Sequence, residues 1–552
     1  MGNGQRVAVV SGVCAAVVSV AGLGAWSLLG GDEEDGPTRP VAATSEDRQG
    51  GGEESPEAGP PDEREVLETS GAFLEAWASG DLAAAAELTD DPEAARAALG
   101  ALVEDAALAR VTVRPGAPDG ARVPFALESS VSWEDQPAVP LAWDSELTVV
   151  RDEAGDGARV AWQPSLLHPE LAEGARIETG PDGEAPPVEA LDANGEPLDA
   201  EALPSLAPLI EQLRERYEEE AGGTPAVSTR IVDAEGETVA TLAELAEAEP
   251  GRVPTTIDPA LQRAAQAAID DAQRGAVVAV EPSTGAIRAV ANAPADGFDT
   301  ALQGSYAPGS TFKIVSSSLL IDRDLASPDR RHPCPRYFTH GGWRFQNDDE
   351  FDIPNGTFAD SFARSCNTAF ISQAPELSDD DLGNHARDVF GLGLNWQVGV
   401  TTMDGRVPTQ SDAQMAASLI GQGAVRMNPL NMASVSATVQ SGTFRQPYLV
   451  PADFDGRELA QAPGSLSAEA AGQLRALMNR AVTNGTATQA MAGLGGNVGA
   501  KTGSAEVDGQ ENPNAWFTAF RDDLAVAAVV PDSGHGGEFA GPVVADVLRA
   551  AG

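Results

Sequence analysis

The residues Tyr306-Ala-Pro-Gly-Ser-Thr-Phe-Lys-Ile-Val315 decide the fold of this chain. Pro308-Gly309 indicates a turn, and the apolar residues after it predict a buried helix. Ser310 and Lys313 are three residues apart, so at helical pitch the serine hydroxyl and the lysine amine lie on one face and can touch. A free serine is a weak nucleophile and needs an adjacent base. Lysine is a base only when its amine is neutral, which requires burial, a neighbouring cation or a helix N-terminus.

The distribution of lysine supports this pairing. The chain contains 35 basic residues, but only Lys313 and Lys501 are lysines and the other 33 are arginines. Arginine keeps its proton at every accessible pH and cannot serve as a base. The two positions that retain lysine are therefore the positions where proton transfer is expected.

Three short motifs occur in a fixed order along the chain: Ser310-x-x-Lys313, then Ser365-Cys-Asn367, then Lys501-Thr-Gly503. Each motif is weak alone, but together and in this order they resemble the signature set of the penicillin-recognising serine acyltransferases. The region 251–552 as a whole resembles a penicillin-binding transpeptidase domain. The resemblance includes the segments Asn428-Pro-Leu-Asn-Met432 and Val482-Thr-Asn-Gly-Thr-Ala487.

The resemblance implies a role for each motif residue. Ser310 would attack the carbonyl between the last two D-alanines of a peptidoglycan stem peptide, and Lys313 would take its proton. Lys501 would help to keep Lys313 neutral through like-charge repulsion. Ser365 would relay a proton to the leaving amine, and Asn367 would hold the substrate amide.

The third motif is expected to bind the end of the substrate. The hydroxyls of Thr502 and Ser504 fit the terminal carboxylate, Lys501 supplies charge, and Gly503 lets the strand lie close to the substrate. The backbone N–H groups of Ser310 and Ser504 would form the oxyanion hole. β-Lactams mimic D-alanyl-D-alanine and would stop at the acyl-enzyme.

Cys334 and Cys366 are the only cysteines beyond the first apolar stretch. We expect both to be outside the cell, where disulfides persist, and we predict a bridge between them. The loop that it would close contains Gly341-Gly342 and Pro354-Asn-Gly356, a composition typical of a mobile segment. The alternative is two unpaired thiols, with Cys366 buried as a small apolar residue.

Composition excludes several classes of function. The 552 residues carry 84 acids and 35 bases, and the formal net charge of -49 argues against a nucleic-acid partner. We interpret the acidity mainly as a solubility or salt adaptation. The five histidines are scattered without metal-ligand spacing, and no nucleotide-binding loop is found, so neither metal nor cofactor is expected.

The first 64 residues predict a membrane tether. Val7 to Leu29 is a mostly apolar run of membrane-spanning length, preceded by Arg6 and followed by an acidic stretch. We expect residues 1–30 to be a short cytoplasmic stub and a retained single-pass anchor, with the catalytic part outside the cytoplasm at the cell membrane. A cleaved signal peptide is the alternative. Residues 31–64 have almost no apolar side chains and predict a disordered acidic linker.

Residues 65–165 are predicted to form a small cone-like α+β domain. Helical apolar spacing is followed by four stretches with strand character: 109–113, 122–133, 142–150 and 158–162. The stretches Phe73–Asp81 and Trp162–Ser165, with His168-Pro169, resemble the N-terminal domain of methicillin-resistance-type penicillin-binding proteins. Residues 166–250 are expected to be a reduced pedestal or linker, with one helix at 206–220 and a strand at 227–232.

The catalytic region 251–552 predicts one antiparallel sheet flanked by helices. A helix is expected after Asp258-Pro259, strands at 276–280 and 286–291, three more strands at 500–506, 515–521 and 524–530, and a last helix at 542–551. The overall fold class is therefore multidomain α+β with a serine transpeptidase, β-lactamase-like domain at the C-terminus.

Three alternative functions use the same motifs. A β-lactamase would deacylate with water, but about 250 extra residues argue against a single secreted domain of the usual size. A β-lactam receptor needs a signalling part, which the six residues before Val7 cannot supply. A silent scaffold is opposed by the retained lysines. We favour a class B, monofunctional transpeptidase that acts on stem peptides and β-lactams, with glycan strands supplied by a membrane glycan polymerase partner.

Overall fold

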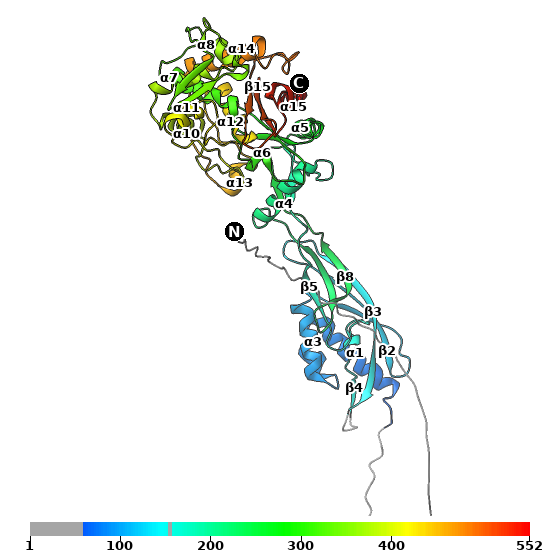
Figure 1. The fold of residues 1–552 in the computed structure, drawn as a ribbon. Helices are drawn as coiled ribbons and strands as arrows, with labels where there is room; N and C mark the ends of the chain where they lie inside the picture. Colours follow the sequence, from blue (N-terminus) through cyan, green and yellow to red (C-terminus); the bar gives the residue numbers. More distant parts are fainter. Residues whose placement is uncertain (1–58, 153–156, 552) are drawn as a thin grey trace, which may run out of the picture. The chain divides into compact units, whose positions relative to one another are not determined.

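The computed structural model describes residues 59–152 and 157–551 (Figure 1). The predicted span at 7–29 and most of the predicted linker at 31–64 lie outside these residues. Among the helices that are described, none combines the length and the apolar character needed to cross a membrane.

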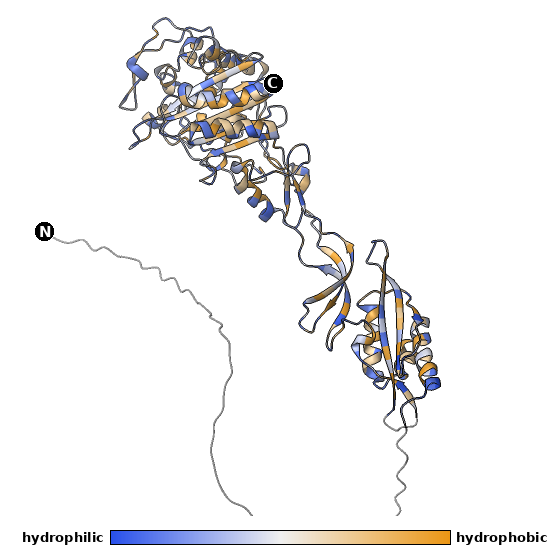
Figure 2. Cartoon of the chain, turned by 90° about the vertical axis from the view of Figure 1, so that its right-hand side faces the viewer, coloured by the Kyte–Doolittle hydropathy of each residue, from blue (hydrophilic) through white to orange (hydrophobic). Residues whose placement is uncertain are grey.

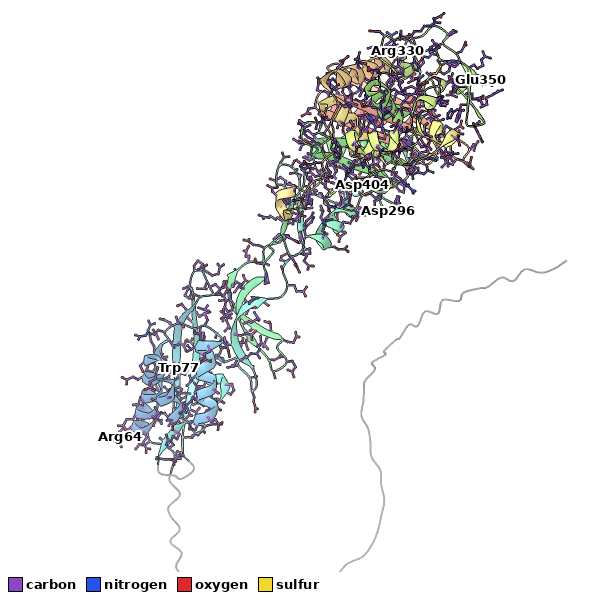
Figure 3. All side chains as sticks on the ribbon, turned by 90° about the vertical axis from the view of Figure 1, so that its left-hand side faces the viewer. Arg64, Trp77, Asp296, Arg330, Glu350 and Asp404 are labelled. Atoms are coloured by element: carbon purple, nitrogen blue, oxygen red, sulfur yellow. A yellow bond between two sulfur atoms is a disulfide. The ribbon has the colours of Figure 1, made fainter. Side chains whose placement is uncertain are left out.

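The N-terminal domain packs three helices on a four-stranded sheet. Asp62 caps the first helix through a capping box, and Gly80, with a φ of 83°, ends it. Trp77, labelled in Figure 3, lies on the buried face of this helix and packs against Phe73 and Phe125. The strands follow the order β1-β2-β3-β4. The elements are α1 (Glu63–Ser79), α2 (Leu82–Glu87), α3 (Pro92–Glu104), β1 (Thr112–Pro115), β2 (Arg122–Val131), β3 (Val139–Arg151) and β4 (Ala158–Val160). The predicted helices and four strands are present, with shifted ends.

The segment 166–250 contains more regular structure than the sequence predicts. One helix and one strand were expected, but β5, β7 and β8 form a three-stranded sheet and β6 pairs in parallel with β9. The elements are β5 (Arg176–Asp182), β6 (Glu189–Leu191), α4 (Ala207–Arg216), β7 (Ala226–Val232), β8 (Thr238–Ala246) and β9 (Arg252–Pro254). The sequence did not predict the additional strands because the segment is rich in Pro and Glu. In β8, for example, partly buried and exposed positions alternate only weakly, so the strand has no clear period of two.

The C-terminal region is built on a five-stranded sheet of order β11-β10-β16-β15-β14. All neighbouring strands are antiparallel. Both ends of the region supply strands, as the sequence predicts: β10 (Gly275–Val280), β11 (Ile287–Ala293), β14 (Val498–Ala505), β15 (Asn514–Arg521) and β16 (Leu524–Val530). The strands β10 and β16 are buried along their whole length, which requires cover on both faces. Figure 2 shows these strands as largely apolar ribbons.

Helices cover the two faces. The helices α5 (Pro259–Ala272) and α15 (Gly536–Ala550) pack against each other and the sheet, and α12 (Pro429–Ser441) lies on the other side of it (Figure 1). Asp258 caps α5 with Pro259 at its first position, as predicted. The prediction that the last helix begins near Pro542 is wrong, because α15 begins at Gly536 and contains Pro542. The free energy gained by packing the first turn against the sheet exceeds the cost of the backbone hydrogen bond that Pro542 cannot make.

The central stretch forms a short 3₁₀ turn before its helix. The turn η3 (Gly309–Phe312) carries Ser310, and α7 (Lys313–Asp322) begins at the lysine. A 3₁₀ turn has three residues per turn, so it aligns residues i and i+3 even more closely than an α-helix does. The remaining elements are α6 (Thr300–Gln303), β12 (Tyr337–His340), β13 (Trp343–Gln346), η4 (Asp348–Glu350), α8 (Phe358–Ala363), α9 (Thr368–Ile371), α10 (Asp381–Phe390), α11 (Asp412–Ser418), α13 (Ala452–Asp455) and α14 (Ala468–Asn484).

Candidate active site

The three predicted motifs meet around the amine of Lys313. Its Nζ lies 2.9 Å from Oγ of Ser310, 2.7 Å from the backbone oxygen of Ser365 and 2.7 Å from Oδ1 of Asn367. The side chain is fully buried. Residues 310, 313, 365 and 367 therefore form one cluster, although 52 residues separate the lysine from Ser365.

The second lysine completes the cluster. Nζ of Lys501 lies 2.8 Å from Oγ of Ser365 and 2.9 Å from the backbone oxygen of Thr502. Oγ of Ser365 is also 3.4 Å from Nζ of Lys313, so this hydroxyl lies between the two amines. Ser365 has a φ of 56°, a left-handed conformation that is unfavourable for serine and is typical of strained functional sites.

Both lysines have lowered pKa values. Burial lowers the pKa of Lys313 well below its usual value, the charge of Lys501 lowers it further, and only Asp348 acts in the opposite direction. Burial lowers the pKa of Lys501 to about 7. Both shifts favour the neutral form of the amines, the state in which Lys313 can accept a proton.

When the amine of Lys313 is neutral, donor and acceptor counting gives the direction of its hydrogen bond with Ser310. A neutral amine has two N–H groups and one lone pair. The backbone oxygen of Ser365 can only accept, and so can Oδ1 of Asn367, whose Nδ2 donates to the oxygen of Gln346. These two acceptors use both N–H groups of Lys313. The lone pair is left for the hydroxyl proton of Ser310.

The edge strand β14 forms the opposite wall. β14 is the last strand of its sheet and packs against η3, so the Lys-Thr-Gly motif faces Ser310. Oγ1 of Thr502 is 2.6 Å from Oγ1 of Thr486, and Oγ of Ser504 is 3.3 Å from Nδ1 of His535. A Cβ on Gly503 would lie 3.0 Å from the backbone oxygen of Pro308, so glycine permits this close approach.

A cleft of about 1330 Å³ opens at the cluster. Ser310, Ser365, Asn367 and the residues 502–504 line it, and Trp343 lies on its rim with 65% of its surface exposed. The cleft is large enough for a peptide, and the free edge of β14 can pair with an extended chain.

The predicted disulfide is present. Cys334 and Cys366 are bonded with a Cα separation of 6.1 Å. The loop between them was expected to be mobile, but it contains the β12–β13 hairpin and is fixed by Asn347. Oδ1 of this buried asparagine accepts from the backbone N–H groups of Asn367 and Thr368 at 2.8 and 3.1 Å. Its Nδ2 donates to the oxygen of Phe351 at 2.8 Å.

Sequence reasoning missed two residues of the site. Asn347 lies in a stretch interpreted as loop, and no local pattern marks it. His535 is one of the five scattered histidines to which the sequence analysis assigns no role, but it lines the cleft beside Ser504. Both depend on contacts between segments far apart in the chain. In the described part of the chain, no cluster of His, Cys, Asp or Glu has the arrangement of a metal site.

The geometry defines a class of enzyme. A serine hydroxyl lies 2.9 Å from the amine of a buried lysine with a lowered pKa, a second serine lies between two lysines, and an edge strand borders the cleft. This is the arrangement of an activated nucleophile with its base and a site for an extended substrate. It is the site of a serine acyltransferase.

Two domain families match the chain. Residues 275–549 match the family described as "Penicillin binding protein transpeptidase domain". Residues 66–175 match the family described as "NTF2-like N-terminal transpeptidase domain".

Curated relatives carry related names. The chain is 31% identical over 362 residues to "Peptidoglycan D,D-transpeptidase PbpA" of Mycolicibacterium smegmatis, a match that covers 54% of this chain and 72% of the relative. The protein of the same name from Mycobacterium tuberculosis is 29% identical over 364 residues, with the same coverage. "Stage V sporulation protein D" of Bacillus subtilis is 26% identical over 44% of this chain and 42% of the relative.

Solved structures share the fold. The D,D-transpeptidase domain of a peptidoglycan glycosyltransferase from Eggerthella lenta has a TM-score of 0.51 at 24% identity and covers 67% of this chain and 98% of its own. A chain from "a peptidoglycan synthase complex" has a TM-score of 0.55 at 22% identity, with coverage of 70% and 94%. The chain belongs to the penicillin-binding proteins of the class B D,D-transpeptidase type, the family that cross-links peptidoglycan and binds penicillin.

Proposed function

We propose that this chain cross-links peptidoglycan by acyl transfer from D-alanyl-D-alanine stem peptides, with Ser310 as nucleophile and Lys313 as its base. The observation that supports these roles most directly is the 2.9 Å contact between Oγ of Ser310 and a buried amine whose other donors are already used. The base thus lies at the nucleophile before substrate binds, and burial favours its neutral form.

Acylation forms one bond and breaks another. Oγ of Ser310 attacks the carbonyl carbon of the penultimate D-alanine while its proton passes to Lys313. The backbone N–H groups of Ser310 and Ser504 stabilise the oxyanion. The C–N bond to the last D-alanine then breaks, and Ser365 relays a proton from Lys313 to the leaving amine. D-Alanine leaves, and the stem peptide remains as an ester on Ser310.

Binding and transfer use the remaining residues. Asn367 holds the amide of the donor peptide, while Thr502 and Ser504 donate to the terminal carboxylate beside Lys501. An amine of a second stem peptide then attacks the ester carbonyl and loses its proton to the same relay. The bond between the acyl carbon and Oγ of Ser310 breaks, the proton returns to Oγ, and the new amide is the cross-link. A β-lactam follows the first half of this path, but its ring-opened leaving group stays attached.

The position of the chain in the cell is part of the proposal. The apolar run at 7–29 would hold the protein in the cell membrane, with the catalytic region outside the cytoplasm. Neither matched domain polymerises glycan by its description, so a membrane glycan polymerase would supply the strands. Protease protection of spheroplasts tests the topology, and cross-linked co-purification from membranes tests the partner.

Intact-mass analysis with labelled penicillin tests the function. We expect one penicillin adduct per chain on the wild type and none on the Ser310→Ala variant. The adduct on the wild type should persist for hours. Adduct on the Ser310→Ala variant would refute the nucleophile. Loss of the adduct within seconds would instead identify a β-lactam hydrolase, the alternative that uses the same motifs.

A further inference from the structure

His535 lies beside the residue that would bind the substrate carboxylate. Its Nδ1 is 3.3 Å from Oγ of Ser504 and 3.8 Å from Oδ2 of Asp348, and 65% of its side chain is exposed to the cleft. Asp348 comes from η4 (Asp348–Glu350), which also lines the cleft, so Nδ1 of the imidazole faces both a hydroxyl and a carboxylate.

Close packing fixes this position. Gly536, the residue after the histidine, begins α15 directly against the sheet. A Cβ there would lie 2.0 Å from the backbone oxygen of Trp516 and 2.3 Å from that of Gly503. Only glycine allows the helix to start so close to the Lys-Thr-Gly strand. His535 is therefore held at Ser504 by the backbone rather than by a flexible loop.

The charge of the imidazole decides what Ser504 can do. A serine hydroxyl has one proton to donate, and an imidazole nitrogen accepts when bare and donates when protonated. A neutral ring with bare Nδ1 takes the hydroxyl proton of Ser504. A protonated ring donates to Oγ instead, which leaves the hydroxyl proton free for a substrate carboxylate. The imidazolium also adds a positive charge next to that carboxylate.

We propose that His535 is a positioning residue whose protonation turns the Ser504 hydroxyl toward the substrate carboxylate, so that recognition of carboxylate-bearing donors and β-lactams strengthens as pH falls. The inference rests on the proposed role of Ser504. The geometry that supports it is the contact of Nδ1 with both the Ser504 hydroxyl and the Asp348 carboxylate.

The other charged groups of the cleft make this cation important. Five carboxylates line it: Asp348, Asp349, Glu506, Asp508 and Glu538. The guanidinium groups that line it are those of Arg344, Arg364 and Arg549, and that of Arg344 stacks on Tyr337. Among these lining groups the carboxylates outnumber the guanidinium groups, so Lys501 is not the only cation that an anionic substrate needs there. A cation at His535, with Asp348 as its counter-ion, adds positive charge at the point where the carboxylate binds.

The test compares pH profiles of acylation. Full-length wild type and His535→Gln, in detergent, are acylated by a labelled penicillin across about pH 5 to 8. Glutamine keeps a hydrogen bond to Ser504 but cannot ionise. Loss of Lys313 as a base at low pH affects both proteins, so the wild-type to variant ratio of second-order rate constants removes it. We expect this ratio to rise by roughly tenfold toward acid, the scale of one charge-assisted hydrogen bond.

Control variants and a penicillin ester without a free carboxylate distinguish a positioning role of His535 from a purely structural one. His340, on β12 and outside the cleft lining, gives the control His340→Gln, which should follow the wild type. The penicillin methyl ester, which lacks the carboxylate, should give a flat ratio. Asp348→Asn should weaken the acid-side gain more than Asp349→Asn does, because only Asp348 has an ion pair with the histidine among the described contacts.

Each outcome decides one idea. A ratio that stays constant with pH, or one that changes equally for the methyl ester, overturns the role of His535. No adduct on the wild type at any pH would refute the proposed function itself. The expected change should fall mainly on the dissociation constant of the first complex, because the carboxylate is bound both before and during attack.

Discussion

At the scale of single residues, the site depends on two buried amines whose pKa values are lowered by burial, that of Lys313 further by the charge of Lys501. Nζ of Lys313 contacts Ser310, Ser365 and Asn367, and Nζ of Lys501 contacts Ser365 from the other side. The ring faces of Phe370 and Phe362 lie 5.6 Å from the two amines, so both have low-dielectric surroundings. The position of each lysine thus fixes both its charge and its hydrogen bonds.

Replacing each lysine by arginine should show which lysine acts as the base and which contributes mainly its charge. Lys313→Arg puts a permanent charge in place of the base and removes the proton acceptor, so acylation should fall by about 10²-fold or more. Lys501→Arg keeps the charge beside the carboxylate site and should lose less. Stopped-flow acylation with labelled penicillin measures both. Equal, small losses would mean that neither lysine accepts the proton of Ser310.

The lowered pKa of Lys501 also predicts how stability depends on pH. The folded value is about 7 against 10.5 for the ordinary side chain. Between these values the unfolded chain binds the proton and the folded chain does not, so stability rises with pH through this window. Lys501→Met should flatten the rise. Urea unfolding from about pH 7 to 10 measures it, and parallel slopes in wild type and variant would contradict the shift.

Much of the site could be predicted at this scale because its reactive residues belong to short sequence motifs. Ser310, Lys313 and Lys501 follow from residue type, spacing and the absence of other lysines. Asn347 and His535 could not be predicted in this way, because each gains its role from one contact with a segment far along the chain. An asparagine or histidine in a loop has the same local sequence whether it faces water or a catalytic motif.

At the scale of elements, the loop between Cys334 and Cys366 carries the second motif. The disulfide holds its two ends, and Asn347 binds its middle to the backbone of residues 367 and 368. These contacts hold the backbone of Ser365 in its left-handed conformation, which could otherwise relax to a more favourable one. The sequence predicted the bridge but missed the order of the loop, because its Gly- and Asp-rich composition is also typical of mobile segments.

Removing the disulfide should affect stability and acylation together. The double variant Cys334→Ser/Cys366→Ser loses a crosslink across 32 residues, worth roughly 3–4 kcal/mol on the chain-entropy model. Release of Ser365 should also slow acylation. Thermal unfolding and adduct formation by mass spectrometry measure the two effects. A variant with lowered stability and unchanged acylation would show that Asn347 alone holds the motif.

At the scale of the whole chain, the described residues form two hydrophobic cores that do not follow the domain limits predicted from sequence. Strands β5 and β7 contribute Ile177 and Ile231 to the core of the N-terminal domain. Helix α4 contributes Leu209 and Leu213 to the core of the transpeptidase domain. The segment 166–250 is thus shared between two neighbours. Composition marked this segment as distinct, but composition does not record which core each apolar side chain enters.

Polar contacts join α4 to the catalytic region as well. Nη1 of Arg457 donates to Oη of Tyr217 at 3.0 Å and to Asp455 at 2.7 Å. Burial alone would raise the pKa of Asp455, but the hydrogen bond and charge of Arg457 outweigh it and leave the pKa below its usual value. A nearly buried ion pair adds little to the free energy of unfolding, but removing one partner is strongly destabilising because the other charge is left buried without a partner.

These contacts predict that the catalytic region is not independent at the boundary suggested by sequence. A fragment of residues 252–552 lacks α4, so it exposes the surface that Leu209, Ile210 and Leu213 cover and leaves Arg457 without Tyr217. Each buried leucine or isoleucine contributes about 1.5–3 kcal/mol, so the fragment should unfold at a clearly lower temperature than residues 59–552. Differential scanning calorimetry measures this, with residues 187–552, which keep α4 and β6, as the control expected to recover most of the loss. If 252–552 unfolds at the same temperature as both longer chains and is acylated at the same rate, α4 contributes nothing to the catalytic core, and the sequence-based boundary at residue 251 is the physical one.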